Sequence, residues 1–290
     1  MPGAAESPSD PGKLLRGGEF YSPLQARLST DDFLLSELRQ PCARRVPRHE
    51  HELAYVTVVL RGTYYEGDCR LDELSPFTAV FNPAGVTHST DIGPAGAYFF
   101  TIEFRRQALF SLGLRLPDRT VFDRGAGAML WPGLRLFSAF RAQADDAHML
   151  EADVLDLMGA ISGLHAPGKS VPPWFRRIKD RLHENYRDHL RISDLARDAG
   201  VHPVHLARVF RQVERRSPGE YQQRLQVRAA CQLLCNPDWP LAAIAVECGF
   251  ADQSHFTRVF RRITGATPAR FRAAVVREKL ESAQVFLREP

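Results

Sequence analysis

The spacing of apolar positions divides the chain into a strand-rich first part and a helical second part. Short apolar runs of β-branched and aromatic residues, such as 55–60 and 97–102, predict strands up to about residue 104. Glycine and proline turns between these runs favour a small barrel or sandwich. From residue 128 to 164 the apolar positions recur at spacings of three and four, which predicts helices. After residue 171 no segment resembles a strand, and several short helices are expected.

Composition and charge narrow the class of protein. The chain has 290 residues, 44% hydrophobic and 25% charged, which excludes a fully disordered chain and favours two domains. No apolar run approaches the roughly 18 residues that span a bilayer. Residues 171–290 hold 21 Lys and Arg against 13 Asp and Glu, although the whole chain carries only +4. The excess of positive charge in residues 171–290 has two equally weighted explanations. It marks a surface that binds a polyanion, or it is an ordinary variation of surface charge between domains.

A duplicated segment is the most informative feature of the sequence. Residues 202–221 align with 252–271, and six positions are identical: His205/His255, Arg208/Arg258, Val209/Val259, Phe210/Phe260, Arg211/Arg261 and Pro218/Pro268. Upstream, residues 195–201 parallel 244–250, each with a glycine where a tight turn between helices needs a positive φ. Each copy therefore predicts a short helix, a turn at its glycine and a second helix.

The second helix of each copy has one apolar and one polar face. In the first copy Leu206, Val209 and Phe210 are expected to pack inward and to leave arginines outside. A plain helical bundle with solvated arginines is the alternative. Two copies with arginine at the same outward position, in a basic region, favour DNA binding. The helix expected over 217–234 would hold the two copies in successive major grooves, about 34 Å apart.

Residues 174–273 resemble the double helix-turn-helix DNA-binding domain of the AraC/XylS family of bacterial transcription regulators. The second copy resembles the family signature most closely, from 244–250 through 256–260 to 265–268 and Phe271. The resemblance implies a set of DNA-binding residues on both recognition helices. They are Val204, Ala207, Arg208 and Arg211 in the first copy, and Gln253, Ser254, His255, Thr257, Arg258 and Arg261 in the second. The first copy departs from the family at Arg215, where a glycine usually follows the recognition helix.

A group of histidines lies in the strand-rich part. His49 and His51 alternate on one strand, so both imidazoles face the same side, and His88 at a turn one hairpin later can complete three metal ligands. This arrangement resembles the two cupin motifs, and a cupin-like barrel is the usual sensor domain of the AraC/XylS family. The cupin pattern has a glutamate three or four residues after the second histidine, where this chain has Tyr55 or Val56.

Two interpretations of the histidines stay open. Either they bind a divalent metal, or they hydrogen-bond within a metal-free pocket that takes a small-molecule effector. An aromatic or other small organic effector is conceivable, and no cofactor is required. The expected effector-binding residues are His49, His51, Tyr55, Tyr64, Phe81 and His88.

The expected fold class is α+β with two domains. The expected segments are a disordered lead-in (1–17), a cupin-like effector-sensing and dimerisation domain (18–165), a linker (166–173), a double helix-turn-helix domain (174–275) and a helical tail (276–290).

The predicted function is a transcription regulator that binds specific DNA sequences, is not an enzyme and responds to an effector. The expected partners are double-stranded promoter or operator DNA, the effector, a second copy in a homodimer, and RNA polymerase if the protein activates. Because residues 1–13 lack the apolar segment of a secretory signal, the protein is expected in the bacterial cytoplasm, at the nucleoid and away from membranes. A metal-dependent cupin enzyme and a passive nucleoid-binding protein are the alternatives.

Overall fold

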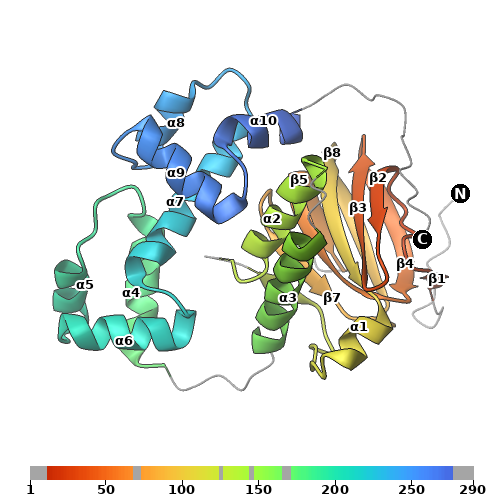
Figure 1. Cartoon of the computed structure of the whole chain (residues 1–290), viewed down its shortest axis with the longest axis horizontal. Coiled ribbons are helices and arrows are strands. Elements are labelled where there is room, and N and C mark those ends of the chain that lie inside the picture. Colours follow the sequence, from red (N-terminus) through yellow and green to blue (C-terminus); the bar gives the residue numbers. More distant parts are fainter. Residues whose placement is uncertain (1–11, 68–72, 124–126, 144–146, 165–170, 277–290) are drawn as a thin grey trace, which may run out of the picture. The chain divides into compact units, whose positions relative to one another are not determined.

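Strands fill the first part of the chain and helices the second, as the apolar pattern predicts. The computed structural model describes residues 12–67, 73–123, 127–143, 147–164 and 171–276 (Figure 1). Contacts between Cα atoms divide the described chain into unit 1, up to Phe122, and unit 2, from Asp123 onward. The predicted two-domain α+β organisation, with helix-turn-helix elements in the C-terminal region, is confirmed.

The strands of unit 1 form one mostly antiparallel sheet in the order β1-β4-β8-β5-β7-β9, with β2 and β3 on one branch and β6 on another. Their bounds are β1 (Lys13–Leu15), β2 (Leu24–Ser29), β3 (Phe33–Gln40), β4 (Arg44–His51), β5 (Ala54–Glu66), β6 (Glu73–Leu74), β7 (Ala79–Asn82), β8 (His88–Phe104) and β9 (Val121–Asp123). The helix α1 (Arg106–Ser111) follows β8.

The long strand β8 organises this sheet. Its first residues pair with β4, its last residues pair with β3, and β5 runs along its other edge. The pairings among the described strands do not close the sheet into a ring, so a cupin-like barrel is not confirmed. Val56, Val58 and Val59 of β5 are all fully buried, which explains why apolar residues occupy both faces of this strand instead of alternating with polar ones.

The N-terminal segment is more ordered than the sequence indicated. Residues 13–15 were expected within a disordered lead-in, but they form β1, which pairs in parallel with residues 49–51 of β4. Burial of the Leu15 side chain accounts for the difference, because one buried leucine stabilises a short edge strand. Residues 1–11 and most of the predicted helical tail, 277–290, lie outside the described residues.

Unit 2 consists of helices. Their bounds are α2 (Leu130–Arg141), α3 (Ala147–Leu164), α4 (Pro173–Glu184), α5 (Ile192–Ala199), α6 (Pro203–Glu214), α7 (Pro218–Leu234), α8 (Leu241–Glu247), α9 (Gln253–Thr264) and α10 (Pro268–Val276). The first helix-turn-helix is α5–α6, the second is α8–α9, and α7 connects them (Figure 1). The glycines at the two turns, Gly200 and Gly249, have φ of 68° and 79°, as predicted.

The helices α2 and α3 belong to unit 2 by their contacts. The Ser138 hydroxyl of α2 donates to the Thr264 carbonyl of α9 at 2.7 Å, and the Phe137 ring lies edge-on to Phe271 of α10. From the sequence, these two helices were expected within the effector-sensing domain at 18–165 instead. The expected linker at 166–173 falls mainly outside the described residues, and the domain limits stay predictions.

The end of α6 contains a strained residue. Arg215 follows the helix with φ 58°, in the left-handed region, where α9 has Gly265 at φ 80°. An L-residue with a side chain is disfavoured in this conformation by about 1 kcal/mol, and glycine is not. Because Arg215 is exposed, Arg215→Gly is expected to raise the free energy of unfolding of unit 2 by about 1 kcal/mol. Urea denaturation measures this change, and unchanged or lower stability would contradict the assignment of strain.

Candidate DNA-binding face and ligand cavity

Each recognition helix begins at a defined cap. Pro203 occupies the first turn of α6, where no backbone donor is needed, and the His202 side chain accepts from the Val204 amide at 3.3 Å. The Asp252 carboxylate caps α9 by accepting from the His255 amide at 2.7 Å. Proline in the first turn and aspartate at the N-cap are common helix-start signals, whereas histidine is not among the usual capping residues, so the role of His202 could not be expected from the sequence.

The two recognition helices present equivalent faces. On α6 the buried residues are Leu206, Val209 and Phe210, and on α9 they are Phe256, Val259, Phe260, Ile263 and Thr264. The ten predicted DNA-binding residues are all exposed or partly exposed on other sides of these helices. Because positions three and four apart share a helix face, Val204, Ala207, Arg208 and Arg211 form one strip on α6. Ser254, Thr257, Arg258 and Arg261 form the matching strip on α9.

The side chains on these two faces differ in the contacts that they make within the domain. Arg258 is exposed, and no hydrogen bond or ion pair within the described chain occupies its guanidinium. Arg208 is also exposed, with a 3.1 Å contact from its Nη2 to Nδ1 of His205 on the same helix. His205 packs on Trp174, and His255 packs on Phe250. The two aligned histidines therefore have a packing role in the helix-turn-helix units, and the arginines are better placed to reach DNA.

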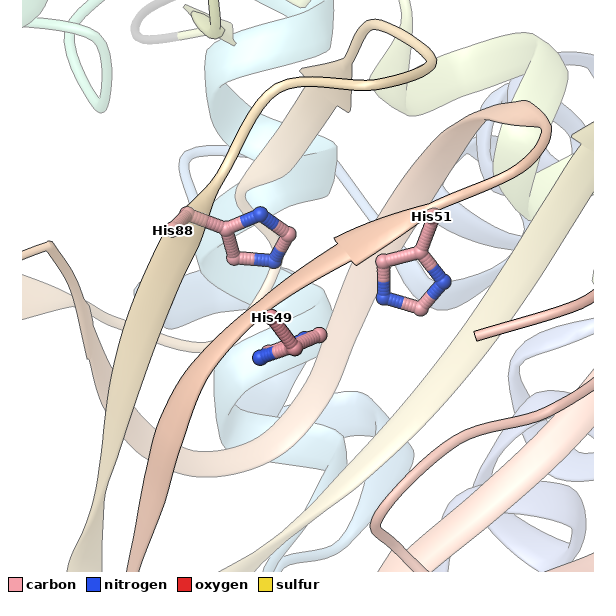
Figure 2. Close-up of side chains that lie close together, drawn as sticks. All are labelled: His49, His51 and His88. Atoms are coloured by element: carbon pink, nitrogen blue, oxygen red, sulfur yellow. The ribbon is translucent and has the colours of Figure 1, made fainter. Parts of the chain in front are cut away.

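A small cavity lies in unit 1 where β4, β5 and β8 meet. Its volume is about 70 Å³, and His49, His51 and His88 line it together. Figure 2 shows His49 and His51 on one strand and His88 on the neighbouring strand, with the three rings gathered together. One nitrogen from each ring lies within 4.8 Å of the other two. The predicted convergence of the three histidines is therefore present in the structure.

Hydrogen bonds orient two of the imidazoles. The Nδ1 atom of His49 lies 2.8 Å from the Pro47 carbonyl, and Nδ1 of His88 lies 3.2 Å from the Val86 carbonyl. A carbonyl oxygen only accepts, so each Nδ1 carries the proton and each Nε2 keeps a lone pair. The Tyr55 hydroxyl, 3.1 Å from His88 Nε2, therefore donates to it.

Two further polar residues of the cavity were not predicted. Asn82 donates from Nδ2 to the Tyr55 hydroxyl at 3.1 Å. Glu66, at the end of β5, places Oε1 3.6 Å from His88 Nε2. Both line the cavity, as do the predicted Tyr55 and Tyr64. Glu66 could have been expected in the cavity from the sequence, because it lies two residues after Tyr64 and alternate residues of a strand share a face.

Phe81 is not among the residues that line this cavity, in contrast to the prediction. The strand register gives the reason: Tyr55 pairs with Asn82, and Val56 pairs with Phe81. Residues directly opposite in an antiparallel pair point to the same face. Tyr55 and Asn82 therefore face the cavity, and Phe81 is buried on the opposite face with Val56.

Burial shifts the ionisation of these groups. It lowers the pKa of His51 to about 2 and that of His88 to about 4, and neighbouring imidazoles add to both effects. It raises the pKa of the Glu66 carboxyl to about 8, with a hydrogen bond from Tyr64 acting in the opposite direction. At neutral pH the three imidazoles are therefore uncharged, and the Nε2 lone pair of His88 accepts from the Tyr55 hydroxyl.

These shifts predict how the stability of metal-free protein depends on pH. Above about pH 7.5 the histidines are neutral in both states, whereas the Glu66 carboxyl, with a pKa of about 8 when folded, still holds part of its proton only in the folded state. The unfolded chain therefore binds fewer protons, and the free energy of unfolding is expected to fall as the pH rises from about 7.5 to 8.5, by on the order of 1 kcal/mol. Denaturation in the presence of a chelator measures this slope. Glu66→Gln should reduce it, and an unchanged slope in that variant would contradict the assignment.

The residues of the cavity fit a divalent transition metal. Three neutral imidazoles form a donor set that such ions use in proteins, and the Glu66 carboxyl lies beside one of them, His88. Two buried atoms of these residues, His51 Nδ1 and Glu66 Oε1, have no hydrogen-bond partner. An unsatisfied buried polar atom is costly, so both atoms are consistent with a ligand at this position.

Comparison with known proteins identifies the class of the C-terminal region. The family model described as "Helix-turn-helix domain" matches residues 195–274. The arabinose operon regulatory protein of Salmonella typhimurium is 33% identical over 128 residues, covering 43% of this chain and 44% of that protein. The transcriptional regulator ExsA of Pseudomonas aeruginosa is 33% identical over 96 residues, covering 33% and 34%. Residues 195–274 are therefore a helix-turn-helix domain of the AraC/XylS kind, and the resemblance drawn from the sequence is confirmed.

The alignments leave much of the relatives unmatched, because the chain spans less than half the length of the curated relatives it matches. Among solved structures, unsaturated fatty acid bound ToxT from Vibrio cholerae covers 86% of this chain and 97% of that chain, at 12% identity and a TM-score of 0.36. An AraC-type protein from Chromobacterium violaceum covers 37% and 96%, at 27% identity and a TM-score of 0.34. No helix in the described ranges has both the length and the apolar character needed to cross a membrane.

Proposed function

We propose that the protein is a transcription regulator that binds specific DNA sequences through α6 and α9. The observation that supports this most strongly is the duplication of one exposed face, with Arg208 and Arg211 on α6 and Arg258 and Arg261 on α9. A recognition helix with polar and arginine side chains on its outer side suits the major groove, where arginine reads guanine through two hydrogen bonds. The match of residues 195–274 to the helix-turn-helix family gives independent support.

Unit 1 is the proposed sensor. Its buried polar cavity supports the binding of a small ligand, which would change how the DNA-binding region is held. We further propose that the regulator acts as a homodimer at the bacterial nucleoid, and that it contacts RNA polymerase if it activates. We also propose that unit 1 is a cupin-like sensor domain.

Footprinting at rising salt tests the DNA-binding function. Contacts to phosphate weaken steeply as salt displaces them, whereas base contacts retain a preference for one sequence. A protected site should therefore remain at salt concentrations where random DNA of the same length is no longer bound. Equal loss of binding to all sequences would support the passive nucleoid-binding alternative and overturn the proposal.

A metal-dependent enzyme is the second candidate, because the three clustered histidines suit a metal centre. One relative, from Bacillus subtilis, is named as a bifunctional transcriptional activator and DNA repair enzyme; it is 31% identical over 99 residues. A screen for turnover with metal-loaded protein separates the two candidates. Turnover without sequence-specific DNA binding would favour the enzyme.

A further inference from the structure

We propose that α6 recognises its half of the DNA site through the C5 methyl groups of thymine, and that Val204 is the residue that contacts them. The assignment rests on the proposed DNA-binding function and names the base chemistry that one recognition helix selects. It gives the two copies of the helix-turn-helix different tasks, because α9 has hydroxyl groups where α6 has only methyl groups.

The two recognition helices agree in the exposure of their outer positions. The exposed positions are 204 and 208 on α6 and 254 and 258 on α9, and the half-buried positions are 205 and 207 on α6 and 255 and 257 on α9. Aligned residues therefore hold equivalent places on the two helices. At two of these places the second copy has Ser254 and Thr257, whereas the first has Val204 and Ala207.

The Val204 side chain is left uncovered by the domain. It is 69% exposed on the first turn of α6, beside the cap formed by His202. The core of the first helix-turn-helix takes Leu206, Val209 and Phe210 from the other side of the helix. The apolar surface of Val204 therefore remains in water, and a partner that covers it gains the free energy of its burial.

Thymine offers the matching apolar group in the major groove. Its C5 methyl points into the groove and is contacted by small apolar side chains, and the N-terminal residues of a recognition helix are those that reach base edges. Val204 and Ala207, three positions apart on one face, can neither donate nor accept a hydrogen bond through their side chains. Placed over guanine or cytosine they would leave polar base atoms unsatisfied, which disfavours those bases.

The charge around this apolar pair favours DNA over an apolar protein surface. Arg208 follows Val204 by four residues, Arg211 follows Ala207 by four, and both arginines are exposed. A 3.1 Å contact from Arg208 Nη2 to His205 Nδ1 holds one of the two guanidinium groups on this side of α6. Methyl groups flanked by positive charge suit a groove that is apolar at thymine and lined by phosphates.

Replacement of thymine by deoxyuridine tests the proposal with the full-length protein. Uracil keeps the base pairing and the O4 acceptor of thymine and lacks only the methyl group. Thymines in the α6 half of a selected duplex are replaced one at a time, and affinity is measured by fluorescence anisotropy. The α6 half is the one whose base preference Arg258→Ala leaves unchanged. At one position or more, wild type is expected to bind about threefold to tenfold more weakly.

Val204→Ser gives α6 the side chain of the second copy at this position. Because Val204 is exposed, the substitution should leave folding intact, which circular dichroism checks. The variant should bind the thymine and uracil duplexes with affinities within about twofold of each other. Ser254→Ala, at the same position of α9, is the matched control. It should keep the full wild-type penalty for uracil in the α6 half.

Three results would count against the proposal, and they are distinguishable. An α6 half without thymine, or one that tolerates uracil at every position, would overturn the methyl contact and leave the DNA-binding function standing. A uracil penalty of equal size in wild type and Val204→Ser would overturn the assignment to Val204. Absence of any sequence preference in the selected DNA would overturn the proposed function together with the methyl contact.

Discussion

Replacing Gly249 by alanine is expected to destabilise unit 2 by about 3 kcal/mol or more. Two costs combine at this turn. The residue has φ 79°, where a Cβ atom is disfavoured, and a Cβ built there lies 2.1 Å from the backbone carbonyl oxygen of Arg187. Because that neighbour is backbone, a side-chain rotation cannot relieve the clash. The second helix-turn-helix is therefore expected to lose its packing.

Gly200, at the same turn of the first helix-turn-helix, provides the matched control. Its φ is 68°, and nothing lies within 4 Å of a Cβ built there. Gly200→Ala should therefore cost only the conformational term, about 1 kcal/mol. Chemical denaturation followed by circular dichroism compares the two variants. Equal costs would show that the close approach of Arg187 to Gly249 does not constrain the turn.

The Arg258→Ala variant is expected to lose about 1–3 kcal/mol of binding free energy at the specific DNA site. This corresponds to an affinity lower by roughly fivefold to 150-fold. The arginine is exposed on α9, and no hydrogen bond or ion pair within the described chain engages its guanidinium, so it is free to bind a base edge. The loss should be confined to sequences that carry the matching base pair, with relaxed preference at that position.

Arg262→Ala is the control on the same helix. Arg262 is exposed as well, but its Nη2 donates to Gln223 Oε1 of α7 at 2.5 Å, so this guanidinium is already hydrogen-bonded within the domain. Its removal should leave base preference unchanged. Competition gel shifts with single-base variants of the site measure both effects. An equal loss on random DNA for Arg258→Ala would show that this residue contacts phosphate only.

The helix-turn-helix elements could be predicted because their determinants are local. Gly200 and Gly249 mark the turns, Asp252 marks a helix start, and the three- and four-residue spacing of apolar positions separates the faces. Each of these signals depends on residues within one or two turns of helix. The structure therefore agrees with the sequence analysis here nearly residue by residue.

The cavity could be predicted only in part, because strand register is not local. His49 and His51 share a face by simple alternation, and the structure agrees. Phe81 was assigned to the wrong face because its register with Val56 depends on how β5 and β7 pair. Glu66 lies 15 residues after His51 in the sequence, and only the pairing of β5 with β8 brings it to the histidines.

Selection of bound duplexes from a random DNA pool by the purified full-length protein tests the central claim most directly. The enriched sequences are expected to contain two half-sites about one helical turn apart, one for α6 and one for α9. Substitutions in α9 should change only one of the two. Recovery of unenriched DNA, or of a single short element that is insensitive to changes in either helix, would contradict the account.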